Sequence, residues 1–215
     1  MQIKIDWRIL TFVLFFFIIK TSKIYLLFLI FVIIHEIAHM IIGIILDFEP
    51  ISMEVTPFGC KMNFKEKINI HNKKILKGTI KSIKSIVVAL AGPISNIFII
   101  VVFLSNKKYS IIVYINAILA IVNSLPIYPL DGGRVLKHLL TLILGRRRAL
   151  FYTNKISNIV LLIVITFVLY VAILIKNFFL LIGIVYLIYL RVKENKLYIM
   201  KERVYKILEK NNLAL

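Results

Sequence analysis

The fold class follows from residues 156–175, which read ISNIVLLIVITFVLYVAILI and contain no charged side chain. A helix needs about 20 such residues to cross the hydrocarbon core of a bilayer, which is about 30 Å thick. The whole chain has the same character, because 60% of its 215 residues are hydrophobic and its mean hydropathy is +0.93. Soluble domains average roughly 45–50% apolar residues. The sequence therefore predicts an integral membrane protein and excludes a disordered chain.

Further apolar runs on both sides of this stretch predict an all-α membrane protein with about six transmembrane helices in one domain, residues 1–190. The first run is expected to be retained, because no small-residue cleavage site follows it as it would in a signal peptide. Residues 191–215 are expected to form a short tail, in which charged and apolar residues alternate as in an amphipathic surface helix. The six runs lie near residues 9–19, 24–46, 86–104, 109–128, 156–175 and 178–190.

The basic residues set the expected orientation. The net charge is +18, from 28 Lys and Arg against 10 Asp and Glu. With six spans, 23 of the 28 basic residues fall on the side that holds both termini, and 5 fall on the other. Lys and Arg are retained on the cytoplasmic side, so both termini are expected in the cytoplasm. Since these residues flank apolar runs, we assign them to lipid headgroups and orientation, and expect no nucleic-acid partner.

Residues 51–64, which read ISMEVTPFGCKMNF, have a different pattern from the spans. Apolar and polar residues alternate at the start, and Pro57-Phe58-Gly59 is typical of a turn. This pattern predicts a small membrane-associated β-hairpin. Cys60 is the single cysteine of the chain, which excludes an intramolecular disulfide and a four-cysteine zinc site.

The second predicted span contains the sequence His35-Glu36-Ile37-Ala38-His39. On a helix the i, i+4 spacing places both imidazoles on one face, where they can share a metal ion. Ionisable residues inside a span are costly and usually mark a functional site. We therefore interpret His35 and His39 as metal ligands and Glu36 as a catalytic base. The alternative is a buried polar cluster held by hydrogen bonds between helices.

Two histidines do not complete a catalytic zinc site, which typically has three protein ligands and an open position. The candidate third ligand is Asp131, in the stretch 123–134 that reads NSLPIYPLDGGR. Its prolines and glycines interrupt a helix, and irregular backbone at membrane depth is tolerated where it lines a cavity or is buried in protein. A plain loop exit with Asp131 capping a helix is the alternative. His71 and His138 are expected at the surface or the membrane interface.

A third feature is the stretch 91–96, which reads AGPISN and lies early in the third span. Glycine and proline there permit close helix contact and a local kink. We interpret this stretch as a packing motif, with Asn96 available to hydrogen-bond a neighbouring helix or the hairpin.

Together these three elements resemble the site-2 protease family of intramembrane zinc metalloproteases, peptidase family M50. The shared motifs are H-E-x-x-H in an early span, A-G-P-x-x-N in the middle span and N-x-x-P-x-x-P-L-D-G-G-R in the next, and the resemblance covers roughly residues 5–190. The last motif and the six-span layout look most like the branch of stage IV sporulation protein FB, which cleaves the pro-segment of a sporulation sigma-factor precursor. Members of that branch often carry a CBS domain associated with ATP. Only about 25 residues follow the sixth span here, so neither the domain nor an ATP response is expected.

The resemblance implies a zinc-dependent endopeptidase that performs regulated intramembrane proteolysis on a membrane-associated protein. It implies one Zn²⁺ held by His35, His39 and Asp131, with Glu36 as general base. Asn123 is the candidate for holding the substrate or the oxyanion. The resemblance also implies that backbone groups of residues 51–58, expected to form a free strand edge, pair with an extended substrate.

Three alternatives stay open beside this interpretation. The first is a site-2 protease that acts on an anti-sigma factor or another membrane protein. The second is a metal transporter, although transporters tend to contain internal repeats and none is visible here. The third is a catalytically silent scaffold, which would not need the Glu36 carboxylate. The sequence leaves open the substrate, any inhibitory membrane partners, the oligomeric state and the physiological metal.

Overall fold

The computed structural model describes residues 2–18, 20, 22–56, 59–66, 74–176 and 180–210. The chain divides into two compact units, Met1–Ser124 and Leu125–Leu215. Helices make up most of both units, as the sequence predicts. His71 and the first two residues of the predicted turn, Pro57 and Phe58, lie outside the described residues.

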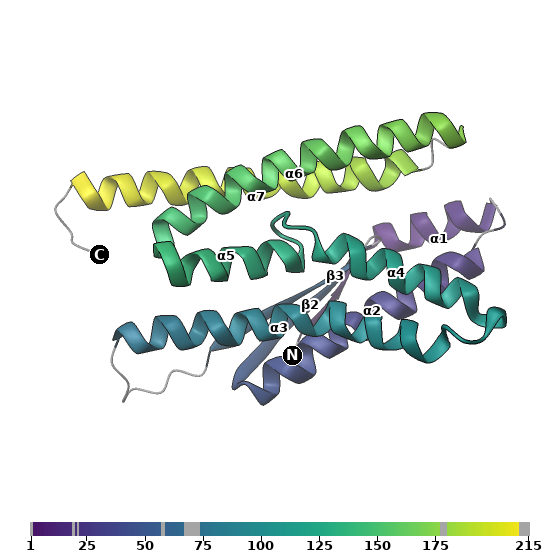
Figure 1. Ribbon diagram of the computed structural model, residues 1–215, viewed down its shortest axis with the longest axis horizontal. Helices are drawn as coiled ribbons and strands as arrows, with labels where there is room; N and C mark the ends of the chain where they lie inside the picture. Colours follow the sequence, from purple (N-terminus) through teal and green to yellow (C-terminus); the bar gives the residue numbers. More distant parts are fainter. Residues whose placement is uncertain are drawn as a thin grey trace. The chain divides into compact units, whose positions relative to one another are not determined.

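Three helices of the first unit, α2, α3 and α4, pack against one another. Their common core contains Phe31 and Val32 of α2 with Ile115 and Leu119 of α4, each at most 7% exposed. Between helices in a bilayer such contacts stabilise the fold mainly by close packing, because lipid tails are as apolar as leucine. The helices of this unit are α1 (Arg8–Ile18), α2 (Ser22–Ile45), α3 (Lys74–Phe103), the short 3-10 helix η1 (Lys107–Tyr109) and α4 (Ser110–Ser124) (Figure 1).

The first unit also contains a three-stranded sheet of order β1-β2-β3, formed by β1 (Gln2–Ile5), β2 (Phe48–Thr56) and β3 (Gly59–Glu66). The antiparallel pair β2–β3 is the hairpin predicted at residues 51–64. The sequence did not predict β1, which pairs parallel to β2 from Gln2 opposite Ser52 to Ile5 opposite Val55. The expectation of a free edge at residues 51–58 is therefore wrong, since β2 is the central strand and the outer strands are β1 and β3.

The hairpin is fixed to the C-terminal end of α2. A Cβ atom on Gly43 of α2 would lie 2.6 Å from Cε1 of Phe64 in β3, so the helix and the strand are in close contact there. Asp47 joins α2 to β2 in the left-handed region, with φ 65°. Lys84 of α3 donates hydrogen bonds to the Leu46 carbonyl at 3.0 Å and to Asp47 Oδ2 at 3.1 Å. These contacts hold the sheet beside the helix that carries the histidine motif.

In the second unit, α6 (Arg146–Ile175) packs against both α5 (Asp131–Leu144) and α7 (Leu180–Lys210), and α6 and α7 run side by side (Figure 1). Two boundaries differ from the sequence prediction. Residues 146–155, which precede the predicted span 156–175, are the first turns of α6, and residues 191–210, expected as a separate tail, continue α7 without a break. A change from apolar to charged residues does not end a helix. The stretch 146–210 contains no proline and one glycine, Gly183, so nothing in its backbone interrupts either helix.

Arg191 ties α7 to α6 at the predicted end of the last span. Its side chain is buried, 4% exposed, and Nε donates to Asn158 Oδ1 at 2.8 Å. Nη2 donates to the Asn154 carbonyl at 2.8 Å and also to Asn154 Oδ1. A buried cation is costly unless its N–H groups are satisfied, and these three bonds to oxygen atoms of two asparagines satisfy part of that requirement.

Three helices in the described part of the chain are long and apolar enough to cross a membrane: Ser22–Ile45, Gly78–Phe103 and Arg146–Ile175. They correspond to the predicted spans 24–46, 86–104 and 156–175. At the predicted span 178–190 the chain forms the start of α7, which is not among these three helices, and at the remaining two predicted spans α1 has 11 residues and α4 has 15. At 1.5 Å per residue these helices are about 16 and 22 Å long, which is shorter than a bilayer core of about 30 Å.

Candidate metal centre

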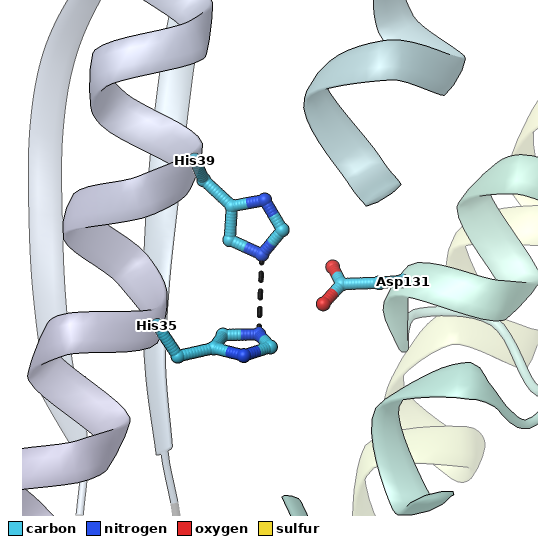
Figure 2. A group of neighbouring side chains, drawn as sticks. All are labelled: His35, His39 and Asp131. Atoms are coloured by element: carbon cyan, nitrogen blue, oxygen red, sulfur yellow. Dashed lines mark hydrogen bonds between the residues drawn. The ribbon is translucent and has the colours of Figure 1, made fainter. Parts of the chain in front are cut away.

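The two histidines of the H-E-x-x-H motif lie on adjacent turns of α2 and are buried, with 4% and 1% of His35 and His39 exposed. Their Nε2 atoms are 3.2 Å apart, and the ring planes are inclined at 82° (Figure 2). Two nitrogens bound to one zinc ion at about 2.0–2.1 Å with roughly tetrahedral angles are about 3.3 Å apart. The rings are therefore arranged as a shared metal ion requires.

The other nitrogen of His39 fixes which tautomer this ring adopts. Nδ1 lies 2.7 Å from the backbone carbonyl of Val88 in α3. A carbonyl can only accept, so Nδ1 carries the proton and donates it, and the lone pair of Nε2 is directed toward His35. This hydrogen bond to a carbonyl is the usual outer contact of a metal-binding histidine.

Asn96 of α3 performs the same task for His35. Its side-chain amide lies 3.0 Å from His35 Nδ1 and is completely buried. With Nδ2 facing the ring, Oδ1 is buried without a hydrogen-bond partner in the described part of the chain. Rotating the amide by 180° exchanges the two atoms, and Oδ1 then accepts the Nδ1 proton. In that arrangement His35 Nε2 carries no proton and can act as a ligand atom. Asn96 thus hydrogen-bonds the neighbouring helix α2 at the histidine motif itself.

Gly92 leaves the space that the two imidazole rings occupy beside α3. A Cβ atom at this position of α3 would lie 2.5 Å from both Cε1 and Nε2 of His35, and would also collide with Nε2 of His39. The following Pro93 lacks a backbone N–H, so the carbonyl of Ala89, four residues earlier in α3, lacks its helical hydrogen bond. The packing expected for this stretch is thus packing against the two imidazoles.

Glu36 follows His35 on α2 and is 7% exposed. A buried carboxylate in the same two turns of helix as two imidazoles is the kind of group that can accept a proton from a water molecule activated by a metal ion. The structure therefore keeps all three residues of the motif in the interior of the protein.

Asp131 belongs to the second unit, where it is the first residue of α5 and is 5% exposed. Its Oδ1 lies 3.5 Å from Nη1 of Arg134, one turn further along the helix. Figure 2 draws its carboxylate at the start of α5. The N-cap residue of this helix is Leu130, so Asp131 is in the first turn and does not have the capping position that the alternative interpretation gave it.

The segment before Asp131 is held by a residue that the sequence did not single out. Ser157 of α6, completely buried, accepts the Tyr128 N–H at 3.0 Å and donates to the Pro126 carbonyl at 3.2 Å. A Cβ atom on Gly133 would lie 2.6 Å from the Ile127 carbonyl oxygen, so the segment packs directly on the first turn of α5. In the sequence, the only feature that could have indicated this role of Ser157 was its polar side chain within the charge-free stretch 156–175.

The remaining candidates lie elsewhere. Asn123 is in the last turn of α4 in the first unit and is partly exposed. His138 is seven residues after Asp131 on α5, about 10 Å along the helix axis. It is partly exposed.

Comparisons with known proteins give one family match and a similar fold. The sequence model of peptidase family M50 matches residues 106–171, a stretch that includes Asn123 and Asp131 but not the histidine motif. The fold is similar to that of a site-2 protease from Methanocaldococcus jannaschii, with a TM-score of 0.62 and 19% sequence identity over 90% of this chain and 91% of that one. No curated protein matches the sequence.

The family match and the shared fold indicate a metalloprotease. With the three long apolar helices they also indicate a membrane protein. Within the first unit, the buried side chains of His35 and His39 could bind a metal ion, and Asp131 is a buried carboxylate of the second unit.

Proposed function

We propose that the protein is a zinc-dependent intramembrane endopeptidase of the site-2 protease type. The observation that carries this proposal is the 3.2 Å separation of the His35 and His39 Nε2 atoms, inside a helix apolar enough to cross a membrane. Asp131 is the proposed third ligand. Its support is a buried carboxylate next to Arg134, in the stretch that matches peptidase family M50.

The chemistry follows from the residues around the metal site. A bound zinc ion would lower the pKa of a water molecule to about 7 and polarise the scissile carbonyl. Glu36 accepts the proton of the attacking water and delivers it to the amine nitrogen of the leaving segment. Val88 and Asn96 hold the two rings in orientation throughout. Asn123 is the candidate for binding the substrate or the oxyanion.

The proposed substrate is a membrane-associated protein, specifically the pro-segment of a sporulation sigma-factor precursor. Its support is the form of the stretch 123–134, which resembles the branch of stage IV sporulation protein FB. A transmembrane anti-sigma factor is the alternative substrate for the same site. Inhibitory membrane proteins are candidate partners in either case.

We further propose that the substrate reaches the site as an extended strand added to β2 in place of β1. A peptide bond in a helix is shielded by its own backbone, so a substrate must unwind before it is cleaved, and a strand edge can hold it extended. β1 pairs with β2 over only four residues, from Gln2 to Ile5. So short a pairing is weak enough for a longer segment to replace.

The proposed topology has six spans with both termini in the cytoplasm. Its support is the distribution of 23 basic residues on one side and 5 on the other. In this arrangement the short helices α1 and α4 cross together with the adjoining residues of the chain.

Cleavage by the purified protein in lipid vesicles tests the proposed function. A membrane-anchored sigma-factor precursor and a transmembrane anti-sigma factor are each incubated with the protein, with a zinc chelator, and with the chelator followed by Zn²⁺. We expect cleavage of the precursor that is lost with the chelator and restored by zinc. Cleavage of the anti-sigma factor alone would change the substrate, and stoichiometric zinc without cleavage of either would exclude both proposed substrates.

A further inference from the structure

A cavity in the second unit is separate from the residues assigned to proteolysis. It has a volume of about 340 Å³ and lies between the first turns of α6 and the last turns of α7. This volume is within the range of roughly 300–1,000 Å³ typical of small-molecule sites. Its lining includes three cations and three tyrosines: Arg147, Arg148, Lys201, Tyr152, Tyr198 and Tyr205.

The charge of this cavity favours an anion. One carboxylate, Glu202, lines it beside the three cations, and this carboxylate lies 3.4 Å from the Lys206 ammonium group. Arg147 is oriented by Glu209, whose carboxylate is 3.0 Å from its guanidinium group. When the ion-pair partners Lys206 and Glu209 are added to the lining residues, the total is four cations and two carboxylates. Among the ion pairs of the described residues, none joins Arg148 or Lys201 to a carboxylate.

The position of the cavity along α6 places it at the surface of the membrane. The charge-free stretch of α6 begins at residue 156, four residues after Tyr152, which is about 6 Å along the axis. Tyrosine is enriched at this level of a bilayer, where its ring is apolar and its hydroxyl is hydrated. Beyond the cavity, Ile159 and Leu162 of α6 are 52% and 65% exposed, so apolar surface adjoins the basic cavity.

We propose that this cavity binds the phosphate group of an anionic phospholipid, with the acyl chains along the exposed apolar surface of α6. Arginine and lysine donate charge-assisted hydrogen bonds to phosphate oxygens, and arginine does so with two parallel bonds. Basic pockets between helices at the level of the headgroups are suited to anionic lipids. A phosphate compound without acyl chains would use the same donors but not the apolar surface.

Lipid binding to the full chain tests this assignment. The protein is reconstituted in nanodiscs of phosphatidylcholine with or without phosphatidylglycerol, and native mass spectrometry measures the lipid that remains bound. The cavity variant is Arg148→Gln combined with Lys201→Gln. The control is Lys193→Gln combined with Lys196→Gln, which removes the same charge from α7 at positions that do not line the cavity. We expect phosphatidylglycerol binding about tenfold weaker in the cavity variant and changed less than twofold in the control.

Several outcomes would overturn the assignment. Equal losses in the two variants would mean attraction to the net charge alone, and no loss in the cavity variant would exclude the cavity. Equal retention of phosphatidylcholine would exclude selection for an anionic lipid. Displacement of phosphatidylglycerol by inorganic phosphate would indicate a soluble phosphate compound instead. Arg148→Gln alone, at an exposed position, gives the same comparison if the double variant does not fold.

Discussion

At the scale of single residues, the Glu36 side chain separates catalysis from metal binding. Glutamine in its place has the same size and cannot accept a proton, so Glu36→Gln should lower proteolysis by at least about 100-fold while the zinc content stays unchanged. His39→Ala is the matched variant that should lose both. Metal analysis and a cleavage assay on the purified proteins measure the two properties. Retained cleavage by Glu36→Gln would contradict the assignment of this residue as the base.

Gly92 provides a second residue-scale test, and α3 contains its own control. In Gly92→Ala the new methyl group would lie 2.5 Å from His35 Nε2, so we expect zinc affinity to fall by roughly 10–100-fold. Gly78→Ala on the same helix has no atom within 4 Å of the new Cβ and should bind zinc normally. It should also stabilise α3 by up to about 1 kcal/mol, because alanine favours a helix over glycine. Zinc titration of both variants measures the difference, and normal binding by Gly92→Ala would mean that the metal lies elsewhere.

The third ligand is tested by comparing residues seven positions apart on α5. Asp131→Ala should lower both bound zinc and activity, because it removes the proposed carboxylate ligand. His138→Ala and His71→Ala should change neither. Atomic absorption on the purified variants gives the zinc content. If His138→Ala lost zinc and Asp131→Ala kept it, the ligand set would have to be reassigned.

At the scale of secondary structure elements, β1 competes with the proposed substrate for β2. Deletion of residues 2–5 exposes the β2 edge at residues 52–55, so we expect a lower KM for the substrate with kcat and zinc content unchanged. Met53→Pro is the opposite change. It puts a proline in the central strand, so we expect the Met53→Pro protein to lose activity. The control variant Met53→Ala should keep its activity. Steady-state kinetics on the three variants distinguishes these effects, and a higher KM after the deletion would show that β1 itself helps to hold the substrate.

The elements that the sequence predicted are those with a local pattern. The H-E-x-x-H spacing and the alternation in residues 51–64 each describe the conformation of one short stretch, and the structure contains the corresponding helix and hairpin. β1 has four residues and pairs with a strand about fifty positions later, so no local pattern indicated it. Gly92 and Ser157 matter through contacts with distant segments, namely His35 and the segment before Asp131. Such contacts depend on packing and are invisible to periodicity.

At the scale of the whole molecule, the basic residues connect the direction of substrate access with the lipid site. In the proposed topology, the ends of α6 and α7 that line the cavity are on the cytoplasmic side, where the leaflet carries anionic lipids. The stretch 47–85, which includes the hairpin, is on the same side. A membrane-associated precursor and an anionic lipid would therefore both reach the protein from its cytoplasmic side.

Cysteine labelling tests this orientation directly, because Cys60 is the single native thiol. In a Cys60→Ser background, Asn106→Cys lies between α3 and α4, and Lys206→Cys lies near the end of α7, both at exposed positions. We expect Asn106→Cys to react with an impermeant maleimide in intact cells, and Lys206→Cys to react only after the membrane is permeabilised, since 23 of 28 basic residues lie on the side of Lys206. The Cys60→Ser protein without a new cysteine gives the background. The reverse pattern would put the hairpin outside the cell, where no cytoplasmic sigma-factor precursor could reach it.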